Sequence, residues 1–321
     1  MAKSKLLVNM SKFFSTPVLL IGFNRPDTMQ QVFEAVRKAK PAKLYYAVDG
    51  ARPGKDEDEK VKQVQNIINE VDWKCDLHTL FREENMGCGW GPANAISWAF
   101  ETTDRLIVLE DDCVPSQSFF RFCDEMLEMY KEDTRINIIS GRSHLHGTSF
   151  FDKQDYIFTH YAHTWGWATW KRCWLNFDMY MSDVPAFLEQ GGALNILPTD
   201  EQGIRANKNL EKKYKEIQRE VTHSWDSQWS YARLKTGLGI VPAHNLIHNI
   251  GNVGTHSNTK LNKDMLAEEM PDVLRHPCFV MPCREYEIAH YKTHIKRQNC
   301  LIRKVYSMIC RELRSLFGYE R

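Results

Sequence analysis

The chain lacks the features that mark membrane-spanning and exported proteins. No eighteen consecutive residues are apolar, although a membrane-spanning helix needs about that number. The basic segment from Met1 to Ser15 contains no apolar stretch long enough for a signal peptide. The nine cysteines form an odd set without a close pairing pattern, so reduced thiols are the simplest interpretation. These absences lead us to expect a cytoplasmic protein.

The sequence also lacks an excess of charge of either sign. It has 42 lysines and arginines against 41 acidic residues, a net charge of +1, whereas nucleic-acid-binding domains usually carry a basic excess. Hydrophobic residues make up 43% of the chain and charged residues 26%, which are the proportions of a soluble globular protein. We therefore expect no nucleic acid among its partners.

Two glycine-rich signatures of nucleotide-binding enzymes are missing as well. The first apolar stretch, Val18 to Phe23, runs into Asn24-Arg25-Pro26-Asp27 instead of Gly-x-Gly-x-x-Gly, which argues against a dinucleotide-dependent dehydrogenase. The Gly-Lys-Ser/Thr element of a P-loop does not occur in the chain, which argues against an ordinary ATPase.

Short apolar stretches alternate regularly with amphipathic segments. The apolar stretches predict strands near residues 18–23, 44–48, 75–81, 106–109, 136–140 and 239–242, and the amphipathic segments predict helices near 28–39, 61–71, 92–100 and 116–132. Such alternation is typical of an α/β fold, in which a mostly parallel, Rossmann-like sheet is flanked by helices.

The most informative stretch is the fourth predicted strand, Leu106 to Leu109, which runs into Glu110, Asp111 and Asp112. Four aliphatic residues in a row are typical of a strand that is buried on both faces. The carboxyl end of such a strand is where open α/β sheets bind their ligands. Three adjacent carboxylates repel one another unless a cation is present, and their oxygen atoms suit Mg²⁺ or Mn²⁺. The alternative is an inert, solvated acidic turn.

Polar residues also follow the other three strands of this half of the chain. Asn24 and Arg25 follow the first strand, Asp49 follows the second and Arg82 follows the third. Because parallel strands end at the same edge of a sheet, we expect these side chains to line one crevice together with the three acids.

The order of these motifs resembles that of the GT-A glycosyltransferases, and more narrowly that of the N-acetylglucosaminyltransferase I group and its bacterial relatives. The matching elements are Val18 to Arg25, Val48 to Gly50, Val108 to Asp112, Trp225-Asp226 and Gly251 to His256. They span about three quarters of the chain, and their order and spacing are more specific than any single motif. One element departs from the family, whose Trp-Asp-Asp-Trp stands here as Trp225-Asp226-Ser227-Gln228-Trp229.

The resemblance implies roles for the residues at the strand ends. Asp112, the last acid, would bind the metal, and Asp111 would contact the ribose of a nucleotide. Arg25 and Asp49 would help to hold the uridine portion. The residues that we assign to the nucleotide-sugar are therefore Asn24, Arg25, Asp49, Arg82, Asp111 and His256. His256 lies in a Gly-rich loop and has a second candidate role as a metal ligand, beside the alternative of a purely structural histidine.

Asp226 is the candidate catalytic base, with Asp200 and Glu201 as less favoured substitutes. A carboxylate that accepts the proton of an acceptor hydroxyl allows a one-step displacement with inversion. The flanking tryptophans predict an apolar setting that would raise the pKa of Asp226. The alternative interpretation is that Ser224 and Asp226 begin a helix that runs through Leu234.

The segment from His163 to Trp170 is rich in aromatic residues. By the resemblance, Trp165, Gly166 and Trp167 would lie on the acceptor side, where tryptophan faces stack on sugar rings. Core packing is the alternative for the same tryptophans. Four nearby histidines, His144, His146, His160 and His163, match the spacing of no common structural zinc site and have no cysteine pair beside them, so zinc is not the favoured interpretation.

The sequence thus favours a glycosyltransferase that uses a nucleotide-sugar, with UDP as the expected nucleotide and a glycan or lipid-linked molecule as acceptor. A sugar nucleotidyltransferase is one alternative, but the Gly-rich, lysine-containing signature of that class is missing after the first strand. A non-catalytic carbohydrate-binding relative is another, and the complete acidic triplet argues against it.

We expect residues 14–260 to form the GT-A domain and residues 261–321 a C-terminal extension. The tail from Cys300 to Arg321 has five Lys or Arg residues against two Glu, and its apolar stripe comprises Leu301, Val305, Met308, Ile309 and Leu313. Such a helix is suited to peripheral contact with the inner face of an anionic membrane. The alternative is a helix docked on the enzyme, with its basic face in solvent.

Overall fold

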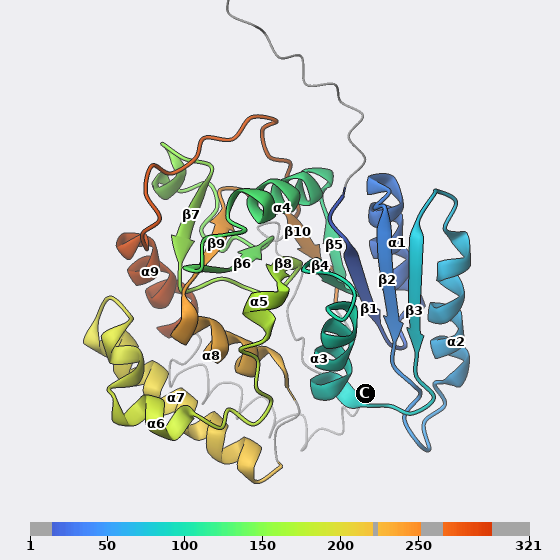
Figure 1. Cartoon of the computed structure of the whole chain (residues 1–321), viewed down its shortest axis with the longest axis horizontal. Helices are drawn as coiled ribbons and strands as arrows, with labels where there is room; N and C mark the ends of the chain where they lie inside the picture. The colour runs from blue at the N-terminus through green and yellow to red at the C-terminus, as the bar shows by residue number, and fades with distance from the viewer. Residues whose placement is uncertain (1–14, 221–223, 252–265, 297–321) are drawn as a thin grey trace, which may run out of the picture.

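The computed structural model describes residues 15–220, 224–251 and 266–296 (Figure 1). Its main feature is an eight-stranded sheet with the strand order β3-β2-β1-β4-β8-β6-β9-β7. The strands are β1 (Val18–Gly22), β2 (Lys43–Val48), β3 (Asp76–Phe81), β4 (Arg105–Glu110), β6 (Ile136–Ser140), β7 (Tyr156–Thr159), β8 (Trp167–Trp170) and β9 (Leu238–Pro242). Four of the seven strand pairings are parallel and three are antiparallel. The expected α/β class with a mostly parallel sheet is confirmed.

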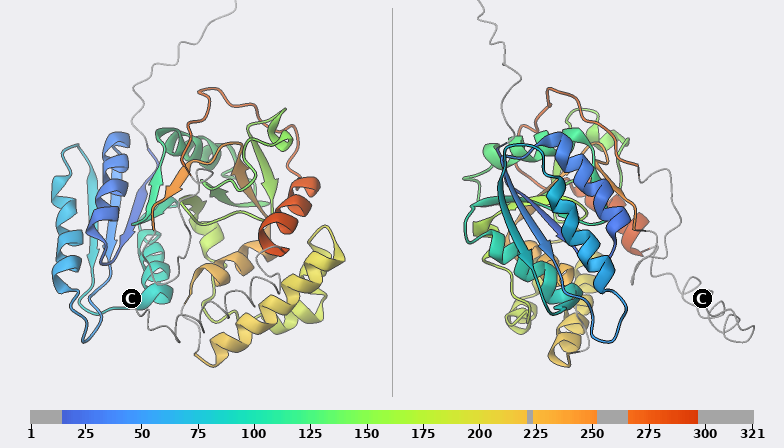
Figure 2. Two further views of the ribbon diagram at one scale, coloured as in Figure 1. Left: turned by 180° about the vertical axis from the view of Figure 1, so that it is seen from behind. Right: turned by 90° about the vertical axis from the view of Figure 1, so that its right-hand side faces the viewer.

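The described residues contain nine α-helices, and helices cover both faces of the sheet, while α6 and α7 lie beyond the strand ends (Figure 2). They are α1 (Pro26–Ala39), α2 (Asp58–Asn66), α3 (Gly87–Ala99), α4 (Gln117–Met129), α5 (Lys171–Trp174), α6 (Val184–Glu189), α7 (Asp200–Gln218), α8 (Asp226–Thr236) and α9 (Arg284–His290). Shorter turns are the 3₁₀-helices η1 (Ile67–Glu70), η2 (Ser149–Phe151) and η3 (Gly192–Asn195) and the π-helix η5 (Tyr291–Lys296).

The order of the first four strands creates a switch point between β1 and β4. The chain moves outward from β1 to β2 and β3, and then returns to place β4 on the other side of β1. Right-handed crossovers put α1 and α2 on one face of the sheet and α3 on the opposite face, as Figure 2 shows. The crevice that opens where the order reverses is the usual ligand site of open α/β sheets.

The strands beside the switch point are the apolar stretches that the sequence marks. All five residues of β1 are buried, as are the four aliphatic residues of β4 from Leu106 to Leu109. β1 pairs in parallel with both β2 and β4. Burial on both faces explains why these strands show no alternation of polar and apolar residues.

Helix α3 begins earlier than the sequence predicts. Residues 82–91 read as a Gly-rich loop, yet the helix starts at Gly87. The carboxylate of Asp49 accepts hydrogen bonds from the backbone N–H groups of Met86, at 3.0 and 3.1 Å, and Gly87, at 3.1 Å. A carboxylate at this position satisfies backbone donors that a helix start leaves free. A residue from β2 therefore extends the helix, which local propensity does not reveal.

Residues 266–296 pack on the sheet domain. Met270, Leu274 and Tyr286 belong to the same hydrophobic cluster as the central strands. The Glu269 carboxylate accepts from the backbone N–H groups of Gln117 and Ser118 at 3.0 and 2.7 Å. This part of the predicted C-terminal extension thus shares the main core, whereas the basic helix predicted from Cys300 lies outside the described residues.

Two further features concern the whole described chain. Its seven cysteines, in residues 15–220, 224–251 and 266–296, are all free thiols. Within these ranges, no helix combines the length and apolarity that crossing a bilayer requires.

Candidate active site

The three acids lie at the switch point, where β4 ends. Glu110 is the last residue of β4, and Asp111 and Asp112 form the turn into the short strand β5 (Cys113–Pro115). The side chain of Asp111 is 6% exposed and that of Asp112 is 17% exposed. Asp112 is therefore the more accessible of these two carboxylates, as a metal ligand must be.

Arg25 joins the first strand to the acids. Its Nη1 lies 3.0 Å from Oδ2 of Asp112, its Nε donates to Oδ2 of Asp111 at 3.2 Å, and its Nη2 pairs with the other oxygen of Asp111. The guanidinium thus supplies positive charge to a site where the sequence predicts that a cation is needed. The resemblance assigns Arg25 to the uridine portion of the donor, but in this structure its guanidinium contacts the acids.

Two carboxyl groups of this site, those of Glu110 and Asp111, are hard to ionise. Burial, together with the charges of Asp112, Asp111 and Asp226, raises the pKa of Glu110 to about 8. Burial also raises the pKa of Asp111 to about 6, although Arg25 opposes this shift. One arginine therefore does not offset the negative charge of the cluster. A divalent cation would favour the ionised acids, so the donor set fits Mg²⁺ or Mn²⁺.

A second chain segment reaches Asp112 from the far end of the domain. Strand β10 (Ile247–Asn249) pairs antiparallel with β5. The side-chain amide of Asn249 donates to Oδ1 of Asp112 at 3.1 Å, and the backbone N–H of Ile250 donates to its carbonyl oxygen at 2.8 Å. A Cβ atom on Gly251 would lie 2.3 Å from Oδ2 of Asp112, so only glycine permits this close approach. The predicted Gly-rich loop thus starts at the acids, while His256 lies outside the described residues.

Asn249 belongs to the site, but the sequence alone gave no reason to assign a role to its side chain. The loop beginning at Asn249 attracted attention because of its glycines and His256. Nothing local in the sequence links Asn249 to an acid 137 positions away. The pairing of β5 with β10 makes that link.

The remaining strand-end residues lie at the same edge and contact protein groups. Asn24 donates to Glu57 at 2.9 Å. Asp49 holds the start of α3, as described above, and Arg82 contacts the side chain of Asn94 and, at 3.4 Å, the carbonyl oxygen of Gly91. These contacts organise the crevice, and assignment of the three residues to a nucleotide stays a prediction.

Asp226 is brought toward the acids from the other half of the domain. It is exposed and is the first residue of α8, where Ser224 donates to its carboxylate. The predicted helix is therefore present. Its negative charge acts on Glu110 and on the buried Arg233, which places it within electrostatic reach of the crevice. The flanking tryptophans do not surround Asp226 as the sequence predicts. Trp225 and Trp229 are buried, whereas the side chain of Asp226 faces solvent.

The three aromatic-segment residues have different environments. Trp167 has no exposed surface and packs against Trp225, with 5.8 Å between ring centroids, and Trp229, at 5.6 Å. It thus has the core-packing role that the sequence offers as an alternative. Trp165 is only partly buried, and the Arg142 guanidinium lies 5.5 Å from its ring centroid. Gly166 has a φ of +57° and passes close to Ile247, which requires a glycine.

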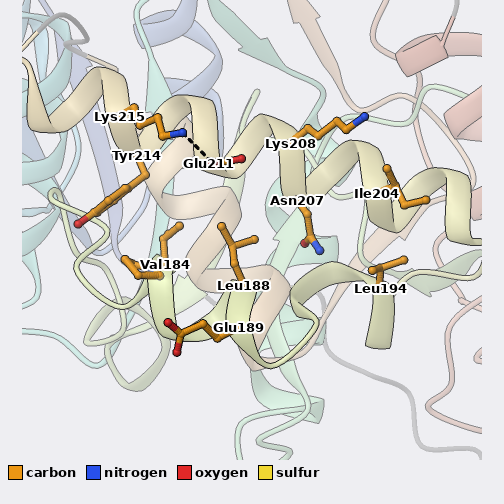
Figure 3. A pocket seen from close by; sticks show the side chains of 11 residues that line it. Val184, Leu188, Glu189, Leu194, Ile204, Asn207, Lys208, Glu211, Tyr214 and Lys215 are labelled. Atoms are coloured by element: carbon orange, nitrogen blue, oxygen red, sulfur yellow. Dashed lines mark hydrogen bonds and ion pairs between the residues drawn. The ribbon is translucent and has the colours of Figure 1, made fainter.

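A pocket of about 580 Å³ lies between α6, η3 and α7 (Figure 3). Its wall includes Leu188, Leu194 and Ile204. All its lining residues come from these three helices, so the elements that form this pocket are not those that form the acidic crevice.

Glu201, a substitute candidate for the base, lies on α7 and pairs with Lys296 at 2.8 Å.

Comparisons with known proteins give similarity at the level of structure. The sequence matches no protein-family model and no curated protein. The structure is similar to mannosyltransferase PcManGT from Pyrobaculum calidifontis, solved in complex with GDP-Man and Mn²⁺, with a TM-score of 0.35 and 11% identity over 51% of this chain and 47% of that chain. It is also similar to HddC from Yersinia pseudotuberculosis, with a TM-score of 0.31 and 9% identity over 49% of this chain and 78% of that chain. This chain thus spans about half the length of the mannosyltransferase.

Proposed function

We propose that the protein is a metal-dependent glycosyltransferase. In this proposal it transfers a sugar from a UDP-linked donor to a hydroxyl group of a glycan or lipid-linked acceptor, with inversion at the anomeric carbon. The observation that carries the proposal is the convergence of carboxylates at the switch point. Glu110, Asp111 and Asp112 arrive from β4, and the charge of Asp226, at the start of α8, acts on Glu110.

The acids divide into two roles by exposure and position. Asp112 is the residue that would hold Mn²⁺ or Mg²⁺, because it is the more accessible of the two aspartates and the Asn249 amide orients it. A bound divalent ion supplies a Lewis acid that neutralises charge on a departing diphosphate. Asp111 is held by Arg25 and contributes negative charge and a hydrogen-bond acceptor at the donor side of the crevice.

Asp226 would act as the base on the opposite side. Its exposed carboxylate accepts the proton of the acceptor hydroxyl while the acceptor oxygen bonds to the anomeric carbon. The bond between that carbon and the diphosphate oxygen breaks, and the diphosphate leaves with the electron pair. Trp165, partly buried beside Arg142, is the side chain that we assign to the acceptor sugar, with Gly166 keeping the chain close to the sheet.

Thermal unfolding with different ligands tests the proposal. UDP with Mn²⁺ is expected to stabilise the protein, by about 2.7 kcal/mol when the ligand is present at 100 times its Kd. A sugar nucleotidyltransferase would instead be stabilised by CTP or ATP, and a carbohydrate-binding protein by sugar alone. Either of those results without a response to UDP contradicts the proposal.

A matched pair of variants connects the response to the acids. Asp112→Asn keeps the side-chain volume but removes a charged ligand, so it should abolish both the metal-dependent stabilisation by UDP and the hydrolysis of UDP-sugars. Glu101→Gln changes an exposed carboxylate that follows α3 and should preserve both. If EDTA and Asp112→Asn leave transfer unaffected, the metal role is wrong.

A further inference from the structure

A cluster of histidines lies at the opposite side of the sheet from β3, between the strand ends and α9. His144 follows β6, His163 precedes β8, and His290 is the last residue of α9. One ring nitrogen of each of these three lies within 4.8 Å of those of the other two. The Nε2 atoms of His163 and His290 are 3.0 Å apart.

A fourth histidine extends the cluster along the same helix. His294 is four residues after His290, and the ring centroids of the two are 5.1 Å apart, while the centroids of His294 and His144 are 4.4 Å apart. Two histidines at this spacing on one helix face are a common pair of zinc ligands. His294 lies in the π-helix η5, and π-helical turns are frequent at functional sites.

Protein contacts hold the segments that carry the cluster. The Ser140 hydroxyl contacts the carbonyl oxygen of His163 at 2.9 Å and that of Arg142 at 3.1 Å, which joins the loops after β6 and before β8. Glu287, one turn before His290, accepts from Thr159 at 3.0 Å and from the backbone N–H of His160 at 2.7 Å. These hydrogen bonds hold the chain segments that carry the histidines in place without the help of a metal ion.

The buried ring of His290 has an unmet hydrogen-bonding capacity. It is 2% exposed, and its Nδ1 has no hydrogen-bond partner among the described residues. A buried polar atom without a partner is costly, and an ion bound through Nδ1, rather than through the Nε2 atom that contacts His163, would satisfy it.

Two positive charges lie within electrostatic reach of the cluster. The guanidinium groups of Arg142 and Arg233 both act on His163 and disfavour any cation nearby. The buried carboxylate of Glu287, bonded to His160 at 2.9 Å, offsets part of that charge.

We propose that His144, His163 and His290 bind a zinc ion, with His294 as the fourth ligand. Zinc prefers imidazole nitrogen in a tetrahedral arrangement, in which ligand atoms lie about 3.3 Å apart at a Zn–N distance of about 2.0 Å. The ring nitrogens of His144, His163 and His290, within 4.8 Å of one another, need only small side-chain movements to reach that geometry, and the ring of His294 lies 4.4 Å from that of His144 between centroids. The ion would fasten α9 and η5 to the carboxyl end of β6. This nitrogen site is distinct from the oxygen site at Asp112, which suits Mg²⁺ or Mn²⁺.

Metal analysis of the purified full-length chain tests this proposal. We expect one zinc per chain after growth with zinc and dialysis, and visible absorption bands of a tetrahedral nitrogen site when Co²⁺ replaces it. His144→Ala and His294→Ala should each weaken zinc binding. Loss of a residue that only supports a ligand weakens metal binding by up to about 100-fold, so His144→Ala, which removes a ligand, should weaken zinc binding by more than that. His78→Ala, which changes a histidine on β3 at the far edge of the sheet, is the matched control and should retain the metal.

Two further experiments distinguish this zinc site from the acidic site and from non-specific binding. Asp112→Asn should keep its zinc and its cobalt spectrum, because the acid belongs to the other site. Removal of zinc by a chelator should lower the Tm of the wild type but not that of His144→Ala. The proposal is overturned if the protein takes up no zinc, if His144→Ala binds zinc as the wild type does, or if the ion is lost in Asp112→Asn alone. His144 and His294 are only half-buried, so these variants are expected to fold.

Discussion

The guanidinium of Arg25 lies 3.0 Å from the carboxylate of Asp112 and so joins the residue after β1 to the turn after β4. These two strands flank the switch point of the sheet. The pair therefore places a fixed positive charge at the position where the acids would otherwise repel one another. A divalent ion bound at Asp112, as we propose, would therefore share this carboxylate with Arg25.

Replacing Arg25 should show whether Arg25 and the metal ion both interact with the carboxylate of Asp112. Arg25→Ala leaves Asp111 and Asp112 without their cation, and we expect a loss of about 1–3 kcal/mol in the free energy of unfolding in metal-free buffer. Mn²⁺ should restore more stability to the variant than to the wild type, because it replaces the missing charge. Urea unfolding with EDTA and with Mn²⁺ measures both values. Arg37→Ala, which removes an exposed pair with Asp72, should show no such dependence on metal, and an equal response to Mn²⁺ in all three proteins would refute the interpretation.

The candidate base can be tested separately from donor binding. Asp226→Asn should lower turnover by about 10² to 10⁴, the usual contribution of a general base, with little change in the Kd for UDP and Mn²⁺. Glu201→Gln changes a carboxylate that is paired with Lys296 and should leave turnover near that of the wild type. Wild-type turnover in Asp226→Asn would move the role to another residue, first to Glu201 or Asp200.

Asn249 should matter through Asp112. Asn249→Ala removes the amide that donates to Oδ1 of Asp112 at 3.1 Å, and loss of such a supporting contact typically weakens metal binding by about 10- to 100-fold. Mn²⁺ titration, followed by the electron paramagnetic resonance of the free ion, measures the change. Asn176→Ala, at an asparagine whose side chain donates to the nearby carbonyl groups of Arg172 and Cys173, is the control. Equal Mn²⁺ affinity in the wild type and Asn249→Ala would show that the amide does not support the metal site.

The contact between Asp155 and Arg275 predicts a pH dependence of stability. Burial opposes ionisation of Asp155, but hydrogen bonds from Arg275 outweigh it and hold the pKa of Asp155 below its usual value. A carboxyl group whose pKa is lower in the folded than in the unfolded state stabilises the fold above its unfolded pKa. That contribution is lost as the pH falls from about 4 through the folded pKa.

The stability difference between the wild type and Asp155→Asn should therefore be largest at neutral pH and shrink in acid. Urea unfolding at a series of pH values measures it. Asp152→Asn, at an exposed acid nearby, should follow the wild type at every pH. A difference for Asp155→Asn that does not change between neutral and acidic pH would refute the role of its charge.

The basic tail supports a prediction about membranes that depends on residues outside the described structure. We expect a protein lacking residues 300–321 to remain folded and to lose co-sedimentation with anionic liposomes, because the tail carries five Lys or Arg residues against two Glu. Binding of the full-length chain should weaken with salt, which screens such contacts. If the truncated protein precipitates or melts much earlier, the tail belongs to the folded core and the membrane interpretation is wrong.

Several parts of this fold follow from local sequence. Val18 to Gly22 and Leu106 to Leu109 are apolar without interruption, and the structure uses both as strands buried on both faces. Helix α4 follows from its amphipathic spacing. The sequence also predicts that Arg25 lies near the acids, because parallel strands end at the same edge of a sheet. Periodicity and strand direction are properties of short segments, so a single sequence reveals them.

Other parts depend on contacts between distant residues. Strands β7 and β8 come from an aromatic segment without clean periodicity, and their pairing with β9, β6 and β4 defines them. The exposure of Asp226 beside the buried Trp225 depends on which face of α8 meets the sheet. The histidine spacing suggests no zinc site because His290 is 127 positions from His163. The sequence by itself determined the strands on either side of the switch point and the acids at the end of β4. Tertiary structure alone decided which side chains meet there, because packing and strand pairing join residues whose distance along the chain carries no signal.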